Sequence, residues 1–102
     1  MHARIARYGY SGDVHEIARI AEEGIGPLYQ QQPGFQAFSV AADSDELFSL
    51  TVWESADQAE NASQVAAGWV QDNLADRMQL KEVKVGELLI STTLGVSTKA
   101  AV

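Results

Sequence analysis

An alternating apolar segment that leads directly into a helix-start signal is the feature of this sequence that most restricts its fold. Residues 47–58 read LFSLTVWESADQ, and apolar and polar side chains alternate up to Trp53, as they do in a half-buried strand. Ser55 and Gln58 then have the spacing of a capping box, in which each side chain satisfies a free backbone N–H at a helix start. The sequence therefore places one strand end and one helix start within a few residues.

Similar signals divide the rest of the chain into further elements. Asp13 and Glu16 have the spacing of a second capping box, Pro33-Gly34 marks a turn, and Gly86 predicts a bulge. The expected elements are a strand at 2–10, a helix from 14 with a short second helical piece at 29–32, strands at 35–42 and 46–54, a long helix at 56–78 and a strand at 81–93.

This β-α-β-β-α-β order in 102 residues predicts one domain of the ferredoxin-like α+β class. In that fold two helices cover one face of a four-stranded antiparallel sheet. We assign the domain to residues 3–93 and a frayed C-terminal tail to residues 94–102.

Composition excludes several classes of function. The formal net charge of −7 disfavours nucleic acid and anionic membranes as partners, and the absence of cysteine excludes disulfides and thiolate chemistry. No apolar run approaches the roughly 20 residues that span a bilayer, and the N-terminus lacks a signal-peptide hydrophobic region. We therefore expect a cytoplasmic protein.

The sheet face without helices needs cover, which predicts a homodimer. We expect Phe48, Leu50 and Val52 to face the helices, together with Phe38 and Val40. The opposite set is mixed but uncharged, as a buried interface would be, and comprises Leu47, Ser49, Thr51, Trp53, Phe35, Ala37 and Ser39. Packing of two sheets face to face would give a symmetric dimer.

The sequence resembles the antibiotic biosynthesis monooxygenase (ABM) superfamily of dimeric α/β-barrel proteins over residues 3–90. The resemblance rests on Pro-Gly-Phe at 33–35, Thr-Val-Trp-Glu-Ser at 51–55 and the Ala-rich helix that follows. Residues 67–75 (AGWVQDNLA) and 85–87 (VGE) resemble an uncharacterised actinobacterial subgroup. The superfamily includes cofactor-independent quinol-type monooxygenases, haem-degrading enzymes, aldehyde- or lactone-processing relatives and proteins with no known activity, so fold alone does not give function.

Departures from the family's patterns narrow this choice. Haem-degrading members carry a Trp where this chain has Asn61. They also carry an iron-ligating His near the position of Gln71 or Asp72, and neither of these side chains binds haem iron as imidazole does. Many quinol-type members carry a His near the Asn61 position, so that base is also missing. We expect no cofactor. His2 and His15 lack metal-ligand spacing, so we expect no metal.

Trp69, Asn73 and Arg77 form the sharpest candidate catalytic group. They recur at i, i+4 and i+8 on the helix face expected to meet the sheet. There Trp69 would stack on a ring, and the Asn73 amide would hold its oxygen and stabilise an enolate. The alternative is structural: Trp69 belongs to the core, and Asn73 and Arg77 lie where the helix frays.

Strand residues supply further candidates. Arg4 and Tyr8 are an even number of residues apart and therefore lie on the same face of the predicted strand, where they would bind an anionic or phenolic ligand if that face lines a cavity. The alternative is that Arg4 and Arg7 form salt bridges with the protein's own carboxylates. Trp53 would face the dimer side or the cavity mouth, where interface or core filling is the structural alternative. The predicted ligand contacts are Tyr8, Trp53, Asn61 and Trp69.

The sequence thus predicts a small ABM-like protein that binds an aromatic or otherwise apolar small molecule. The enzymatic version of this hypothesis is cofactor-free monooxygenation. The alternative is a non-catalytic ligand-binding or assembly module on the same fold.

Overall fold

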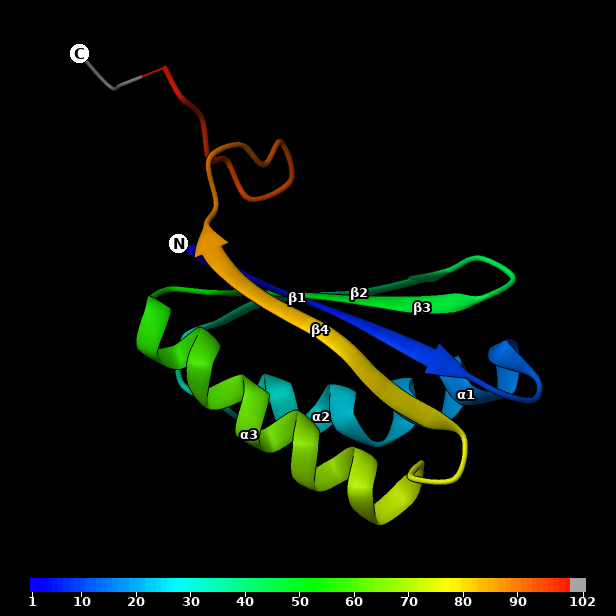
Figure 1. Ribbon diagram of the computed structural model, residues 1–102. Coiled ribbons are helices and arrows are strands. Elements are labelled where there is room, and N and C mark those ends of the chain that lie inside the picture. The colour runs from blue at the N-terminus through cyan, green and yellow to red at the C-terminus, as the bar shows by residue number, and fades with distance from the viewer. Residues whose placement is uncertain (100–102) are drawn as a thin grey trace.

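The structure has the ferredoxin-like arrangement that the sequence predicts. It is a computed structural model that describes residues 1–99. The strands pair antiparallel in the order β2-β3-β1-β4, and the helices cover one face of the sheet (Figure 1). The elements are β1 (His2–Tyr10), α1 (Val14–Glu23), α2 (Ile25–Gln30), β2 (Phe35–Ala42), β3 (Glu46–Trp53), α3 (Ala56–Asn73) and β4 (Met78–Glu87).

Both predicted helix starts are present, and one of them is a complete capping box. The backbone N–H of Gln58 donates to Ser55 Oγ at 3.2 Å, and the Ser55 N–H donates to Gln58 Oε1 at 3.1 Å. At α1, the carboxylate of the N-cap residue Asp13 accepts from the His15 N–H at 2.9 Å. These bonds satisfy N–H groups that have no partner within the helix.

The two faces of β3 are the reverse of those predicted. The face that packs under the helices carries Leu47, Ser49, Thr51 and Trp53, whereas Phe48, Leu50 and Val52 lie on the opposite, open face. Directly opposite residues of antiparallel strands share a face, and the register pairs Thr51 with both Arg4 and Phe38. Both faces of β3 are apolar, so alternation alone did not decide between them, and a one-residue register error exchanges them.

The core lies between sheet and helices in two clusters. One joins β1, α1 and β3 through Tyr8, Ile17 and Leu47. The other joins α2, β3 and α3 through Tyr29, Trp53 and a stripe of small residues on α3, namely Ala59, Ala62 and Ala66. Because alanine side chains are short, this part of α3 lies close to the sheet.

The boundary between α3 and β4 differs from the prediction. The helix ends at Asn73 rather than 78, and β4 runs from Met78 to Glu87 rather than over 81–93. The Asn73 amide donates to the Trp69 carbonyl at 2.9 Å, and such local side-chain bonds compete with helix continuation. The register shift in β4 falls at Lys81, between the partners of Arg7 and Tyr8, and not at Gly86.

After β4 the chain leaves the sheet on the side opposite the helices (Figure 1). Residues 88–99 form the C-terminal segment, in which Ser91 and Val96 exchange two backbone hydrogen bonds of 2.9 Å. Part of the predicted frayed tail is thus a hydrogen-bonded turn, and residues 100–102 lie outside the described part of the chain. Among the described residues, no helix is long and apolar enough to cross a membrane.

Candidate functional site

A groove of about 260 Å³ runs between α3 and β4 on the helix side of the sheet. We call it the α3–β4 groove. Its helix wall includes Ser63, Ala67 and Gln71, which recur every four residues and therefore lie in one row along α3. Leu80 and Val83 form the strand wall, and Arg4 and Tyr8 of β1 form the floor. The short side chains of Ser63, which contacts Arg4 at the floor, and of Ala67 leave this space open.

Arg4 is the most unusual residue of this groove. Its side chain is buried, with the whole residue 1% exposed, and its Nε donates to Ser63 Oγ at 2.7 Å. Its Nη1 is buried without a hydrogen-bond partner among the described residues, and no ion pair found there includes Arg4. Buried charges are normally paired, because their removal from water is costly. The predicted salt bridge of Arg4 is therefore wrong, whereas Arg7, on the open face, does pair with Glu46.

More polar atoms without partners lie beside Arg4. The described residues contain unpartnered buried atoms at Thr51 Oγ1, Trp53 Nε1 and His2 Nδ1, besides Arg4 Nη1. The register pairs Arg4 with Thr51 and His2 with Trp53, so these atoms come from two adjacent cross-strand pairs. One end of the helix-covered sheet face is thus polar and incompletely hydrogen-bonded.

Tyr8 separates the groove from a smaller cavity. The cavity lies between the sheet and the helices, has a volume of about 30 Å³ and has a largely apolar lining that includes Tyr29, Phe38 and Trp69. Tyr8, Val70 and Met78 line both spaces. A volume of this size holds a water molecule but not an aromatic ring, so a ring-sized ligand fits the groove and not the cavity.

The pKa of the Tyr29 phenol is affected by burial and by the neighbouring Arg4 and Tyr8. Burial raises the pKa of Tyr29 to about 12, the positive charge of Arg4 acts in the opposite direction, and Tyr8 raises it further. Arg4, Tyr8 and Tyr29 therefore lie within electrostatic reach of one another. At neutral pH Tyr29 is a neutral hydroxyl.

The structure does not bring Trp69, Asn73 and Arg77 together in one pocket. The Trp69 indole packs so closely on Gly24, at the α1–α2 junction, that no Cβ fits there. Asn73 is exposed and bonds to its own helix, so the expectation that it faces the sheet is wrong. Arg77 lies beyond the helix and pairs with Glu16 of α1 at 3.3 Å. Asn73 and Arg77 do line a common hollow at the end of α3, which Trp69 does not reach.

The other predicted contacts, Trp53 and Asn61, lie outside the groove. Trp53 is fully buried on the helix side, between the edge-on rings of Tyr29 and Phe35. Its expected place on the dimer side or at a cavity mouth is therefore wrong, and the alternative of core filling is confirmed. Asn61 is exposed on α3, with its Nδ2 at 3.5 Å from Gln32 Oε1. Their roles in ligand binding stay predictions.

Ser63 is the groove residue that sequence reasoning missed. It is 59 positions from Arg4 in the chain, and no motif links the two. Its spacing of four residues from Ala67 was the available signal, because neighbouring short side chains on a long helix predict either close packing or a hollow.

Comparisons with known proteins support the fold. No family model and no curated protein matches the chain. Among solved structures, SnoaB, a cofactor-independent oxygenase from Streptomyces nogalater, has a TM-score of 0.68 at 14% identity, covering 89% of this chain and 95% of that chain. A Nitrosomonas europaea protein described as a candidate antibiotic biosynthesis monooxygenase has a TM-score of 0.67 at 17% identity, covering 88% and 100%.

MupZ from Pseudomonas fluorescens has a TM-score of 0.68 at 10% identity, covering 82% of this chain and 69% of that chain. At these identities the likeness concerns the backbone arrangement. The chain therefore has the fold of the antibiotic biosynthesis monooxygenase-like proteins.

Proposed function

We propose that this protein is an ABM superfamily member that binds a small aromatic or otherwise apolar molecule in the α3–β4 groove. The groove itself carries this proposal, because it has side walls of Ala67, Leu80 and Val83 and a few polar groups at its floor. Binding sites for small molecules are concave and mostly apolar, with a few polar groups that orient the ligand. The volume of about 260 Å³ is just below the roughly 300–1,000 Å³ of typical small-molecule sites and suits one or two rings.

We further propose that the bound molecule is oxygenated without metal or flavin. SnoaB is described as a cofactor-independent oxygenase, and its fold is shared. Of the residues predicted from the sequence, Tyr8 stays a proposed ligand contact because it lines the groove, and a ligand contact of Trp69 stays a prediction. Tyr8 lines both the groove and the cavity, and Trp69 lies on the cavity side of the wall that they share.

Oxygen uptake with a panel of quinols and anthrones tests this function. Ala67→Trp places a large side chain in the groove, and Gln64→Trp places the same side chain at an exposed position of the same helix. We expect substrate-dependent oxygen consumption in the wild type and in Gln64→Trp, and its loss in Ala67→Trp. Uptake that persists unchanged in Ala67→Trp would place the chemistry elsewhere.

The position of Asn73 favours the alternative, a non-catalytic binding or assembly module. The amide that was expected to stabilise an enolate bonds to its own helix instead. A binding module would show ligand-dependent thermal stabilisation of the wild type, abolished by Ala67→Trp, with no oxygen uptake for any compound.

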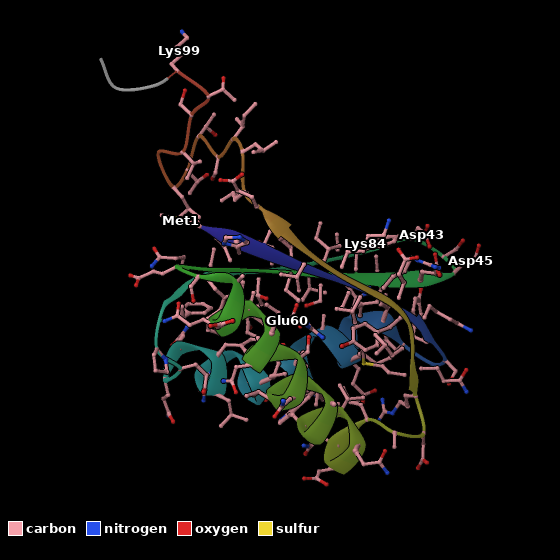
Figure 2. The ribbon with its side chains drawn as sticks, turned by 60° about the vertical axis from the view of Figure 1, so that its left-hand side comes forward. Met1, Asp43, Asp45, Glu60, Lys84 and Lys99 are labelled. Atoms are coloured by element: carbon pink, nitrogen blue, oxygen red, sulfur yellow. The ribbon has the colours of Figure 1, made fainter. Side chains whose placement is uncertain are left out.

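We also propose that two copies pair through their open sheet faces. Ile5 and Leu50, which the register places opposite each other on that face, are 51% and 36% exposed. The C-terminal segment rises on the same side and exposes Leu89 and Ile90 by 61% and 65% (Figure 1). Lys84 also points to this side (Figure 2), where it flanks the apolar residues. Contiguous apolar surface with a polar rim is typical of protein–protein interfaces.

A further inference from the structure

We propose that the Arg4 guanidinium binds the anionic group of a ligand in the α3–β4 groove, and that this ligand is an aromatic molecule bearing a carboxylate or a comparable oxyanion. This inference rests on the proposed function, since it names the chemical class of the molecule that the α3–β4 groove binds. It concerns recognition of the ligand and requires no chemical step.

The other arginines of the chain show what is unusual about Arg4. The chain has four arginines, and three of them have carboxylate partners: Arg7 pairs with Glu46, Arg19 with Glu23 at 3.3 Å, and Arg77 with Glu16 at 3.3 Å. All three pairs are partly exposed. Arg4 is by far the most buried and has none of the chain's 14 acidic residues as a partner among the described residues. The charge that most needs compensation is thus the one that lacks it.

The surroundings of Arg4 would strengthen its contact with an anion. Ser63 Oγ accepts from Nε and holds the guanidinium, Arg4 lines the groove, and its buried Nη1 has no hydrogen-bond partner among the described residues. A planar guanidinium binds carboxylates through directed, charge-assisted hydrogen bonds. The apolar walls lower the local dielectric, which makes such a bond stronger than it would be on the surface.

The ring of the ligand would lie along the apolar part of the groove. Leu80 and Val83 on one side and Ala67 and Val70 on the other leave no second cation in the lining. The net charge of −7 repels anions at long range, so selectivity for an anion has to come from direct contact with Arg4.

A matched pair of probes tests this inference: 2-naphthoate, which is anionic, and methyl 2-naphthoate, which has the same rings and no charge. Isothermal titration of the full chain should show naphthoate binding roughly tenfold tighter than the ester, because a charge-assisted hydrogen bond replaces an unpaired buried donor. Arg4→Gln should abolish this preference by weakening naphthoate binding alone. Arg7→Gln, on the opposite face of the same strand, should leave both affinities unchanged.

The outcomes separate this inference from the proposed function. Equal binding of the two probes to the wild type, or an unchanged preference in Arg4→Gln, would overturn the role of Arg4 and leave the groove as a binding site. Failure of both probes to bind would overturn both. If Arg4→Gln does not fold, the NMR signal of the Arg4 Nε–H in the wild type decides: a shift with naphthoate and none with the ester supports the inference, and no shift with naphthoate overturns it.

Discussion

The Nε of Arg4 on β1 donates a hydrogen bond to the Oγ of Ser63 on α3 at 2.7 Å. This bond joins the floor of the α3–β4 groove to its helix wall, and it is the only hydrogen bond of the Arg4 side chain among the described residues. Ser63 therefore fixes the orientation of a buried guanidinium whose Nη1 has no hydrogen-bond partner among the described residues.

Ser63→Ala should destabilise the protein, because it leaves Arg4 Nε buried without an acceptor. We expect a loss of about 1–3 kcal/mol in the free energy of unfolding, measured by urea denaturation. Ser44→Ala, in the exposed β2–β3 turn, is the matched control and should change stability by less than about 0.5 kcal/mol. Equal effects of the two substitutions would show that the Arg4–Ser63 bond makes no net contribution.

Tyr29 should make stability fall at high pH. Burial raises the pKa of Tyr29 in the folded chain to about 12, from 10.0. Between these values the unfolded chain has released the phenolic proton and the folded chain has kept it, so the free energy of unfolding decreases as pH rises. This contribution to stability is fully present below pH 10 and is lost as the pH rises, with a loss of about 2 kcal/mol in the free energy of unfolding by pH 12.

Tyr29→Phe isolates this effect from other groups that titrate at high pH. Urea denaturation at a series of pH values should show a smaller decrease in stability for the variant than for the wild type between pH 10 and 12. Parallel curves for the two proteins would contradict the raised pKa of Tyr29.

Two glycine substitutions should have opposite effects. Gly24→Ala forces its new methyl group into the Trp69 indole and should destabilise the protein by about 1–3 kcal/mol, as overpacking does. Gly68→Ala adds a methyl group to an open position within α3 and should stabilise it by about 0.5–1 kcal/mol. Thermal unfolding checks both, and a harmless Gly24→Ala would mean that Trp69 does not pack there.

Ile5→Lys should dissociate the proposed dimer without unfolding the chain. Ile5 is half-exposed in the single chain, so a lysine is tolerated there, but its charge would be buried in a sheet-to-sheet interface. Light scattering should give twice the 11.0 kDa chain mass for the wild type and for the surface control Gln64→Lys, and a single-chain mass for Ile5→Lys. A wild type that is monomeric at micromolar concentration would refute the dimer.

Local signals in the sequence predicted the elements and their order. The Ser55–Gln58 capping box and the turn at Pro33-Gly34 act within a few residues, so they could be recognised without knowledge of the fold. The inward face of α3 was also predicted correctly at Trp69. It failed at Asn73, where a side-chain bond to the backbone ends the helix that periodicity alone would continue.

The pairing of distant strands determines the two features that local sequence signals did not predict, namely the orientation of β3 and the environment of Arg4. Which face of β3 meets the helices depends on its register with β1 and β2, and both faces are apolar. The prediction of a salt bridge is confirmed for Arg7 and wrong for Arg4, although both arginines lie on β1 of the same acidic protein. Their difference comes from strand parity, which directs Arg7 to Glu46 on the open face and Arg4 under α3.

Backbone NMR of the uniformly ¹⁵N-labelled full chain with saturating 2-naphthoate tests most directly whether the α3–β4 groove is the ligand site. The amide signals of Arg4, Ser63, Ala67, Leu80 and Val83 should shift together, and those of the open-face residues Ser39 and Leu50 should stay in place. Shifts confined to the open face, with the groove signals unchanged, would contradict the site.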